Sequence, residues 1–291
     1  MASPVATRPC TSLDVAARMG ESIDALWSAT RRIGRSGYSQ FVVKLGSKRR
    51  VISAPREWLK SLQSRLYERV LLEFPVSDAV YSQRGRNVVL NAQQHLARTH
   101  MVALDIKDCF PSTKRTQVSA ALRRAGLDEE AATLITRLTT AKGVLPQGPP
   151  TSPYILNLVM APIDDALSSL AEKFSATYTR YMDDLCFSAN QPLADIVGPA
   201  AEILATGGYR INEAKKRVWG PNDPHTVTKI IVASSLQPNE EYLHDLTQEL
   251  ETYDPRAGAL NKNQLLGKIA WVMQLNAELG VRLMRRFKEV E

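Results

Sequence analysis

The stretch Tyr178-Thr-Arg-Tyr181-Met182-Asp183-Asp184-Leu-Cys-Phe-Ser188 places two adjacent aspartates between two runs of strand-forming residues. Aromatic and β-branched residues favour strands, so the pattern predicts a β-hairpin with both acids at its tip. Adjacent residues on such a tip point apart, and at least one carboxylate can therefore reach a neighbouring strand. A solvated acidic turn is the ordinary alternative for an Asp-Asp pair, so the rest of the chain has to decide between the two.

A second pair of acids follows a short apolar run in Met101-Val-Ala-Leu-Asp105-Ile-Lys-Asp108. Because burial of an unpartnered carboxylate is costly, we expect Asp105 to face a cation, a cluster of donors or open water. Asp105 and an acid of the hairpin tip can then meet at one site. For Asp108 the alternative is a helix cap for the segment after Pro111.

Carboxylates that converge from two strands suit hard divalent cations. Magnesium usually takes one or two carboxylates and keeps positions for water and substrate phosphates. Two such ions roughly 3.5–4 Å apart clamp the attacking and leaving oxygens of a phosphoryl displacement. The two acidic stretches therefore predict a phosphoryl-transfer site with two Mg²⁺ ions.

Positive charge is concentrated at the start of the chain. The 291 residues include 37 Lys and Arg against 30 Asp and Glu, a net charge of +7. Residues 1–100 hold 16 basic and 7 acidic residues, whereas the two later segments, 101–240 and 241–291, are close to neutral. Because phosphate neutralisation dominates nucleic-acid affinity, a basic lobe on a neutral body indicates a polyanion held by one part and processed by another. An ordinary solvated basic surface is the alternative.

The overall composition is that of a globular protein. Hydrophobic residues make up 44% of the chain and charged residues 23%, which argues against a disordered or fibrous chain. Cys10, Cys109 and Cys186 show no CxxC spacing, so we expect neither a disulfide framework nor a zinc site. No run approaches the roughly 20 apolar residues of a membrane span, and the first residues lack a signal-peptide core. We therefore expect a cytoplasmic protein without a membrane partner.

Local patterns predict helices at both ends of the chain and a basic hairpin near its start. Apolar spacing predicts an N-terminal helical segment over 12–33, with Gly34 as its stop, and a long helix from Pro55 that ends before Pro75. Between them, two strands around Gly46-Ser47 form the expected hairpin. The C-terminal segment 240–291 has helical spacing throughout.

Four motifs in order resemble those of reverse transcriptases. Tyr181-Met182-Asp183-Asp184 resembles the YxDD box, and Asp105-Ile-Lys-Asp-Cys-Phe110 resembles the first catalytic aspartate motif. Leu145-Pro-Gln-Gly-Pro-Pro-Thr-Ser-Pro153 resembles the LPQGxxxSP signature, and Gly208-Tyr-Arg-Ile-Asn212-Glu-Ala-Lys215 resembles the GxxxNxxK segment. The resemblance extends from about Arg49 to Asn276, which is most of the chain.

The resemblance implies an α/β (α+β) fold, a right-hand polymerase with fingers, palm and thumb plus an N-terminal helical extension. The extension would be residues 1–37 and the fingers residues 38–100. The palm with part of the fingers would be residues 101–235, and the helical thumb residues 236–291.

The resemblance also implies roles at the catalytic site. Asp105 and Asp183 would bridge two Mg²⁺ ions, with Asp184 as a supporting ligand and the backbone carbonyl of Ile106 completing one coordination sphere. The residues expected to bind the nucleotide are Lys48, Arg49, Arg50, Phe110, Gln147, Gly148 and Lys215. Phe110 resembles the steric gate against a 2′-hydroxyl, and Lys215 resembles the lysine that protonates the pyrophosphate leaving group. A plain core phenylalanine and an exposed lysine at a helix start are the alternatives.

Within reverse transcriptases the chain resembles the bacterial retron type. Asn91-Ala-Gln-Gln-His95 is similar to the NAxxH element of retron enzymes, and Val227-Thr228-Lys229 matches their VTG tripeptide except for its glycine. The side chains expected to bind RNA are Asn91, His95, Lys268, Trp271, Arg285 and Arg286. For the Asn91/His95 pair the alternative is a packed position in the core, and for the C-terminal residues it is a solvated helical face.

The retron resemblance implies a complete reaction. It implies an RNA-directed DNA polymerase that takes deoxynucleotide triphosphates and copies a cognate structured noncoding RNA. Priming from a guanosine 2′-hydroxyl would give branched, RNA-linked single-stranded DNA (msDNA), in antiphage defence with a separately encoded effector protein. The alternatives are another bacterial defence-associated reverse transcriptase with different priming or templating, and a catalytically inactive RNA-binding protein.

Overall fold

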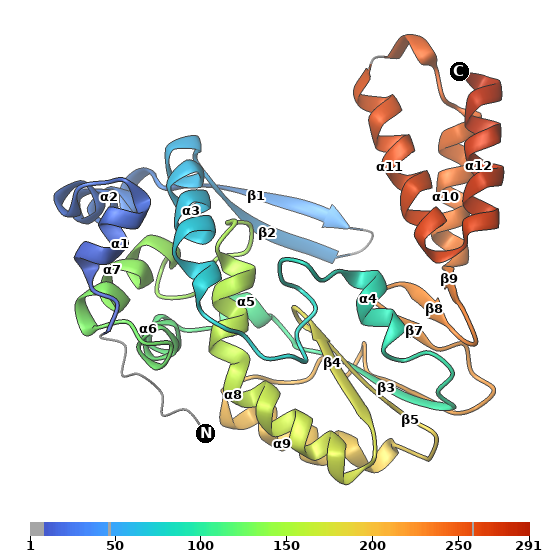
Figure 1. The fold of residues 1–291 in the computed structure, drawn as a ribbon, viewed down its shortest axis with the longest axis horizontal. Helices are drawn as coiled ribbons and strands as arrows, with labels where there is room; N and C mark the ends of the chain where they lie inside the picture. The colour runs from blue at the N-terminus through green and yellow to red at the C-terminus, as the bar shows by residue number, and fades with distance from the viewer. Residues whose placement is uncertain (1–8, 46–47, 258) are drawn as a thin grey trace, which may run out of the picture.

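A computed structural model describes residues 9–45, 48–257 and 259–291, with the side chains of residues 44–50 and 257–260 outside its described part (Figure 1). The mixture of helices and antiparallel sheets agrees with the predicted α+β class. In the described part of the chain, no helix combines the length and the apolar character needed to cross a bilayer.

The central sheet has four antiparallel strands in the order β4-β5-β3-β6. Its strands are β3 (His100–Asp105), β4 (Thr177–Tyr181), β5 (Asp184–Ala189) and β6 (Arg217–Trp219). β4 and β5 form the predicted hairpin, and Met182 and Asp183 make the turn between them. Because β5 also pairs with β3, Asp184 lies directly opposite Asp105 in the register.

Helices beside this sheet supply most of the hydrophobic core. They are α6 (Arg115–Arg124), α7 (Glu129–Thr139), α8 (Ser152–Lys173) and α9 (Val197–Thr206), with the short α4 (Val88–Gln93) and α5 (Cys109–Ser112). α8 is apolar on most of its surface, and its first half is almost entirely buried. Such a helix has to lie inside the protein, where it packs against α6, α9 and β4.

The N-terminal segment differs from the single helix predicted over 12–33. It forms two helices, α1 (Ser12–Met19) and α2 (Ile23–Ser36). Gly20 ends α1 with a left-handed φ of 69°, and the Ser22 side chain then caps α2 by accepting from the backbone of Ala25. Gly34, the predicted stop, lies inside α2, so the capping chemistry at Gly20 and Ser22 outweighs the continuous apolar spacing.

The predicted hairpin and helix after it are present. β1 (Tyr38–Leu45) pairs with β2 (Lys48–Pro55) over eight residues each, and α3 (Glu57–Arg69) continues into the 3₁₀ turn η1 (Leu71–Glu73) before Pro75.

The C-terminal region has a small sheet and a bundle with a core of its own. The sheet contains β7 (Thr226–Val227), β8 (Ile230–Val232) and β9 (Leu236–Pro238), and the bundle contains α10 (Glu240–Glu251), α11 (Ala259–Leu275) and α12 (Ala277–Val290). Figure 1 shows the bundle standing apart from the central sheet and joined to it through β9. The bundle core is built around Leu246, Leu250 and Phe287.

Candidate active site

The three acidic residues singled out in the sequence meet in one cavity. Asp105 ends β3, Asp183 lies in the β4–β5 turn and Asp184 begins β5, and all three line a cavity of about 700 Å³. The register places Asp105 opposite Asp184, and like charges in that relation repel each other across a sheet. A nearby cation offsets such repulsion.

Two side chains of the GxxxNxxK segment hold Asp105. Asn212 donates from Nδ2 to Oδ1 of Asp105 at 2.9 Å, and the ammonium of Lys215 forms an ion pair with Oδ2. The backbone N–H of Asn212 also donates to the carbonyl of Asp105 at 2.8 Å. Asp105 is 5% exposed, so these contacts supply the partners that its burial requires. Lys215 lies in a turn and pairs with Asp105, so the alternative of an exposed lysine at a helix start is wrong, and its role toward pyrophosphate remains a prediction.

Asn212 belongs to the site, although no role was predicted for it from the sequence. Its place in the GxxxNxxK motif, three residues before Lys215, was the feature that could have indicated a role.

A buried ion pair supports the turn that carries Asp183. Arg180 donates from Nε and Nη2 to the two carboxylate oxygens of Asp164, both at 2.7 Å, and both side chains are fully buried. Arg180 also donates from Nη1 to the carbonyl of Met182 at 2.9 Å. Met182 has a left-handed φ of 55°, and its N–H donates to Oγ of Ser82 at 3.1 Å. The turn is therefore held from both sides in a conformation that a non-glycine residue rarely adopts.

The electrostatics of this pair follow from its burial. Removal from water by itself lowers the pKa of Arg180, but the adjacent Asp164 carboxylate outweighs that effect and raises the pKa above its ordinary value. Burial, and next the charge of Asp164, raise the pKa of Tyr178, whose hydroxyl donates to Asp164 at 2.9 Å. Spacing along the sequence did not predict this network. The adjacent acids Asp164 and Asp165, in the middle of the largely apolar helix α8, were the signal that could have pointed to it.

The LPQG loop packs against the hairpin rather than into the cavity. Ser53 of β2 donates its N–H to the carbonyl of Gln147 at 2.9 Å. Gly148 has a φ of 126°, and a Cβ on it would lie 2.9 Å from the carbonyl oxygen of Ser53. Only glycine fits this close approach. The loop is thus built onto β2, and the roles of Gln147 and Gly148 toward a nucleotide remain predictions.

Three more residues of the first acidic motif, Ile106, Asp108 and Phe110, lie outside the lining of the aspartate cavity. Phe110 is 8% exposed and belongs to the main hydrophobic core, which agrees with its alternative interpretation and leaves the steric gate a prediction. Ile106 donates its N–H to the carbonyl of Asp183 at 2.9 Å and so ties β3 to the catalytic turn. Asp108 precedes α5 with a φ of 48°, and its side chain makes no capping hydrogen bond, so the cap interpretation is wrong.

Asn91 and His95 lie in two different environments. His95 is fully buried, with Nδ1 2.7 Å from Oγ of Ser188 and Nε2 2.7 Å from Oγ1 of Thr179. Burial, and next the positive charge of Arg98, lower the pKa of His95 to about 3. Direct contact of His95 with RNA is therefore wrong, because both ring nitrogens are occupied inside the protein. Asn91 lines the cavity of the aspartates, and its Oδ1 has no hydrogen-bond partner.

The predicted RNA-binding residues of the C-terminal bundle mostly contact protein. Trp271 packs against Tyr242 with ring centroids 4.5 Å apart, which accounts for the tryptophan without an RNA contact. Lys268 and Arg286 form surface ion pairs with acids of α10. Such pairs are weak, so their phosphate contacts, like that of the exposed Arg285, remain predictions. The side chains of Lys48, Arg49 and Arg50 lie outside the described part of the chain.

The aspartates fit a hard cation by their chemistry. In the part of the chain that the structure describes, no three His, Cys, Asp or Glu side chains converge tightly enough to hold a metal by themselves. Asn212 and Lys215 engage the two carboxylate oxygens of Asp105 in this structure. The donor set is nevertheless carboxylate oxygen, and the cavity leaves volume for water and phosphate, as Mg²⁺ requires.

Comparison with known proteins agrees with this site. A sequence model of the family "Reverse transcriptase (RNA-dependent DNA polymerase)" matches residues 42–230. The chain is 32% identical to the retron Mx65 reverse transcriptase of Myxococcus xanthus, over 96% of this chain and 71% of that protein. It is 30% identical to the retron Mx162 reverse transcriptase of the same organism, over 86% of this chain and 60% of that protein. The chain therefore spans between about three fifths and seven tenths of these two relatives.

Solved structures show the same fold. The telomerase of Candida albicans, solved with a fragment of telomeric RNA, superposes with a TM-score of 0.52 over 92% of this chain and 60% of that chain, at 11% identity. The apo telomerase of Candida tropicalis gives a TM-score of 0.54 over 88% of this chain and 56% of that chain, at 9% identity. These neighbours support the right-hand polymerase fold. The motif order, the family match over more than half of the chain and the retron relatives together show that this chain belongs to the reverse transcriptase family, as a retron-type RNA-directed DNA polymerase.

Proposed function

We propose that this chain copies a structured noncoding RNA into single-stranded DNA at the cavity lined by Asp105, Asp183 and Asp184. The observation that carries the proposal is that these three carboxylates line one cavity, where Asn212 and Lys215 hold Asp105. Polymerisation requires a 3′- or 2′-hydroxyl, a nucleoside triphosphate and negative charge stabilised between them. Two Mg²⁺ ions, when bound, would stabilise the charge that develops on the attacking and leaving oxygens.

The residues of the chain have separate tasks in this proposal. Asp105 and Asp183 would be the principal ligands for magnesium, with Asp184 and the backbone carbonyl of Ile106 as supporting ligands. Asn212 orients the Asp105 carboxylate through its hydrogen bond to Oδ1. Lys215 neutralises Asp105 in the absence of substrate and donates a proton from Nζ to the departing pyrophosphate.

Substrate selection belongs to residues around the cavity. Gln147 and Gly148 lie in the loop that packs on β2, and their place beside the incoming deoxynucleotide triphosphate is part of the proposal. Phe110 would exclude a 2′-hydroxyl by its bulk, and Lys48, Arg49 and Arg50 would hold the triphosphate. The proposal keeps the predicted divisions: fingers at residues 38–100, palm with part of the fingers at 101–235, and thumb at 236–291.

We further propose the retron reaction for this chain. The support is the similarity to retron relatives and the position of Val227-Thr228-Lys229, which lines the cavity together with Asn91. The product would be msDNA primed from a guanosine 2′-hydroxyl, made in the cytoplasm and used in antiphage defence with a separately encoded effector. Sequencing of the nucleic acid that copurifies with the protein discriminates this from the alternative defence enzymes. DNA joined to a structured RNA through a 2′ linkage is expected, and unlinked DNA contradicts the retron reaction.

The catalytic assignment is tested by Asp183→Asn combined with Asp184→Asn. We expect Mg²⁺-dependent incorporation of deoxynucleotides to be abolished while RNA binding stays nearly intact, because two ligand charges are lost and the basic lobe is unchanged. Primer extension and RNA binding are measured on the same preparations.

The matched control is Asp165→Asn combined with Asp195→Asn. Both are exposed acids outside the cavity, so this variant removes the same charge and should keep wild-type extension. Extension at the wild-type rate by the Asp183/Asp184 variant would show that the cavity is not the polymerase site.

A further inference from the structure

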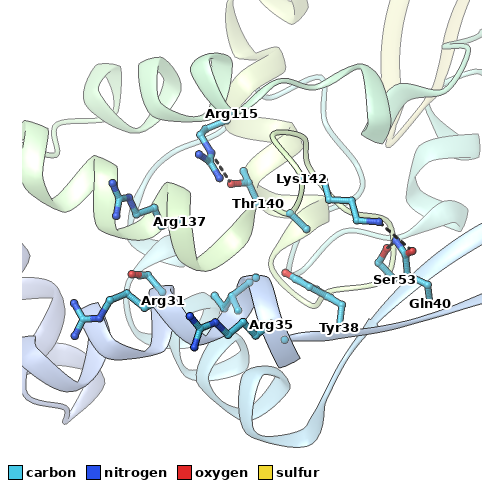
Figure 2. Close-up of a pocket in the computed structure, with 14 residues that line it drawn as sticks. Arg31, Arg35, Tyr38, Gln40, Ser53, Arg115, Arg137, Thr140 and Lys142 are labelled. Atoms are coloured by element: carbon cyan, nitrogen blue, oxygen red, sulfur yellow. Dashed lines mark hydrogen bonds between the residues drawn. The ribbon is translucent and has the colours of Figure 1, made fainter.

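A second cavity lies away from the aspartates and is lined by positive charge. It has a volume of about 490 Å³ and is enclosed by α2, the β1–β2 hairpin, the start of α6 and the end of α7 (Figure 2). Its lining contains no aspartate or glutamate. The five cations in the lining are Arg31, Arg35, Arg115, Arg137 and Lys142.

The contacts of these cations are with neutral groups. Arg31 donates to Oγ of Ser28 at 2.9 Å, and Arg115 donates to Oγ1 of Thr140 at 3.4 Å. Lys142 donates to Oε1 of Gln40 at 3.4 Å, and the guanidinium of Arg137 lies 5.6 Å from the centroid of the Trp27 ring. Among the residues that the structure describes, none of the five is ion-paired with a carboxylate. All five side chains are exposed, and together they concentrate positive charge around one cavity, to which an anionic ligand is attracted.

Stabilisation of helix ends accounts for only part of this charge. Arg35 and Arg137 lie in the last turns of α2 and α7, where a cation is favourable. Arg115 is in the first turn of α6, where a cation opposes the helix dipole and where that helix carries no acid. Arg31 and Lys142 are at neither kind of favoured position. Stabilisation of helix ends therefore does not account for three of the five cations, whereas binding of phosphate would use all five.

We propose that this cavity binds consecutive phosphates of the RNA strand, at a site separate from the catalytic aspartates. The inference rests on the proposed function, since it takes RNA as the substrate. The charge continues beyond the cavity, because α2 also carries the exposed Arg32, while its only acid, Asp24, lies at its opposite end. A strip of this kind suits an extended strand better than a compact nucleotide. Ser53 lines the cavity and bonds to Gln147, so bound RNA would lie next to the loop that flanks the polymerase site.

The test compares two variants from opposite walls of the cavity. One is Arg31→Gln with Arg35→Gln on α2, and the other is Arg115→Gln with Lys142→Gln. Binding of a mixed-sequence single-stranded RNA is measured across a salt series without Mg²⁺, so the result does not depend on catalysis. Each variant should weaken binding and reduce the slope of log affinity against log salt by roughly 0.7 for each phosphate that the variant no longer neutralises.

The matched control is Arg123→Gln with Lys173→Gln, which removes two exposed cations that do not line the cavity. An unchanged salt slope in both cavity variants, or an equal decrease in the control, overturns the proposal. ATP serves as the second probe. If the cavity variants lose ATP binding but keep wild-type RNA binding and its salt slope, the site takes a free nucleotide and the RNA assignment is wrong. Melting temperatures of all variants are compared, so that a loss of binding is not due to unfolding.

Failure of this proposal is distinguishable from failure of the proposed function. The RNA-binding comparison is made without Mg²⁺ and needs no extension, whereas primer extension by the wild-type protein tests the polymerase assignment alone. Absence of extension by the wild-type protein would contradict the proposed function, and the RNA-binding comparison of wild type and cavity variants would still test this proposal.

Discussion

At the scale of single residues, Arg180 links a buried charge to the catalytic turn. Its guanidinium pairs with Asp164 and donates to the carbonyl of Met182, the residue before Asp183. Arg180→Met should lower the free energy of unfolding by about 3–5 kcal/mol, because it leaves the Asp164 carboxylate buried without its partner. Chemical denaturation of the variant measures this loss.

A second variant separates the effect of Arg180 on protein stability from its effect on the position of Asp183. Arg180→Met combined with Asp164→Leu removes both charges and should restore most of the stability, as apolar replacement of buried ion pairs often does. The Met182 carbonyl still lacks its donor, so primer extension should remain about 10–100-fold below wild type through a misplaced Asp183. A shift in the Mg²⁺ concentration needed for half-maximal activity is expected with it. Wild-type extension at wild-type Mg²⁺ dependence would mean that Arg180 serves the fold alone.

At the scale of elements, the turn between β7 and β8 explains a departure from the family pattern. Thr228 and Lys229 both have left-handed φ values, 46° and 67°, which is the geometry of a two-residue type I′ hairpin turn. The retron VTG tripeptide would place glycine at Lys229, where a positive φ costs glycine nothing. The lysine therefore occupies a glycine position in an otherwise intact turn.

Substitutions at Lys229 test this explanation. Lys229→Gly should leave the melting temperature unchanged or raise it, because relief of the left-handed strain offsets the added freedom of the unfolded chain. Lys229→Val should destabilise the protein by about 1–2 kcal/mol, since a β-branched residue resists the same φ. Thermal unfolding distinguishes the two, and equal effects would show that the turn conformation does not limit the choice of residue.

At the scale of the whole molecule, burial of His95 makes stability depend on pH. The ring joins the turn after α4 to the central sheet through Ser188 and Thr179, and its pKa is about 3 in the folded protein against an ordinary value near 6.5. The unfolded chain therefore binds a proton that the folded protein refuses. The contribution of the neutral ring is complete above about pH 6.5 and is lost as the pH falls toward 3.

The expected loss at about pH 4.5 is about 2–3 kcal/mol from this residue, which corresponds to two pH units below the ordinary value. Unfolding free energies measured between about pH 7 and pH 4.5 give the dependence. His95→Gln removes the titrating group and should flatten the slope by about one proton. His244→Gln, at an exposed position on α10, is the control and should retain the wild-type slope. A His95→Gln slope equal to that of wild type would contradict the assignment.

The sequence by itself determined the elements that local chemistry specifies. β-prone residues around Asp183 and Asp184 specified one hairpin, and the aromatic and β-branched residues within 38–45 and 50–53 specified the β1–β2 pair. The motif order identified the three carboxylates, because a polymerase needs acids at the ends of two particular strands. Apolar spacing failed only where capping at Gly20 and Ser22 divided one predicted helix into two.

The tertiary structure decided which partner each polar side chain has. Asn212, Arg180 and Asp164 acquired roles through neighbours at distant positions in the chain, and spacing along the sequence carries no record of such contacts. For the same reason His95, at a plausible position for contact with RNA, is buried between two hydroxyls of the sheet. The cationic cavity draws its walls from separate elements. Its charges are scattered in the sequence, and only the packing of α2 and α7 beside the hairpin brings them together.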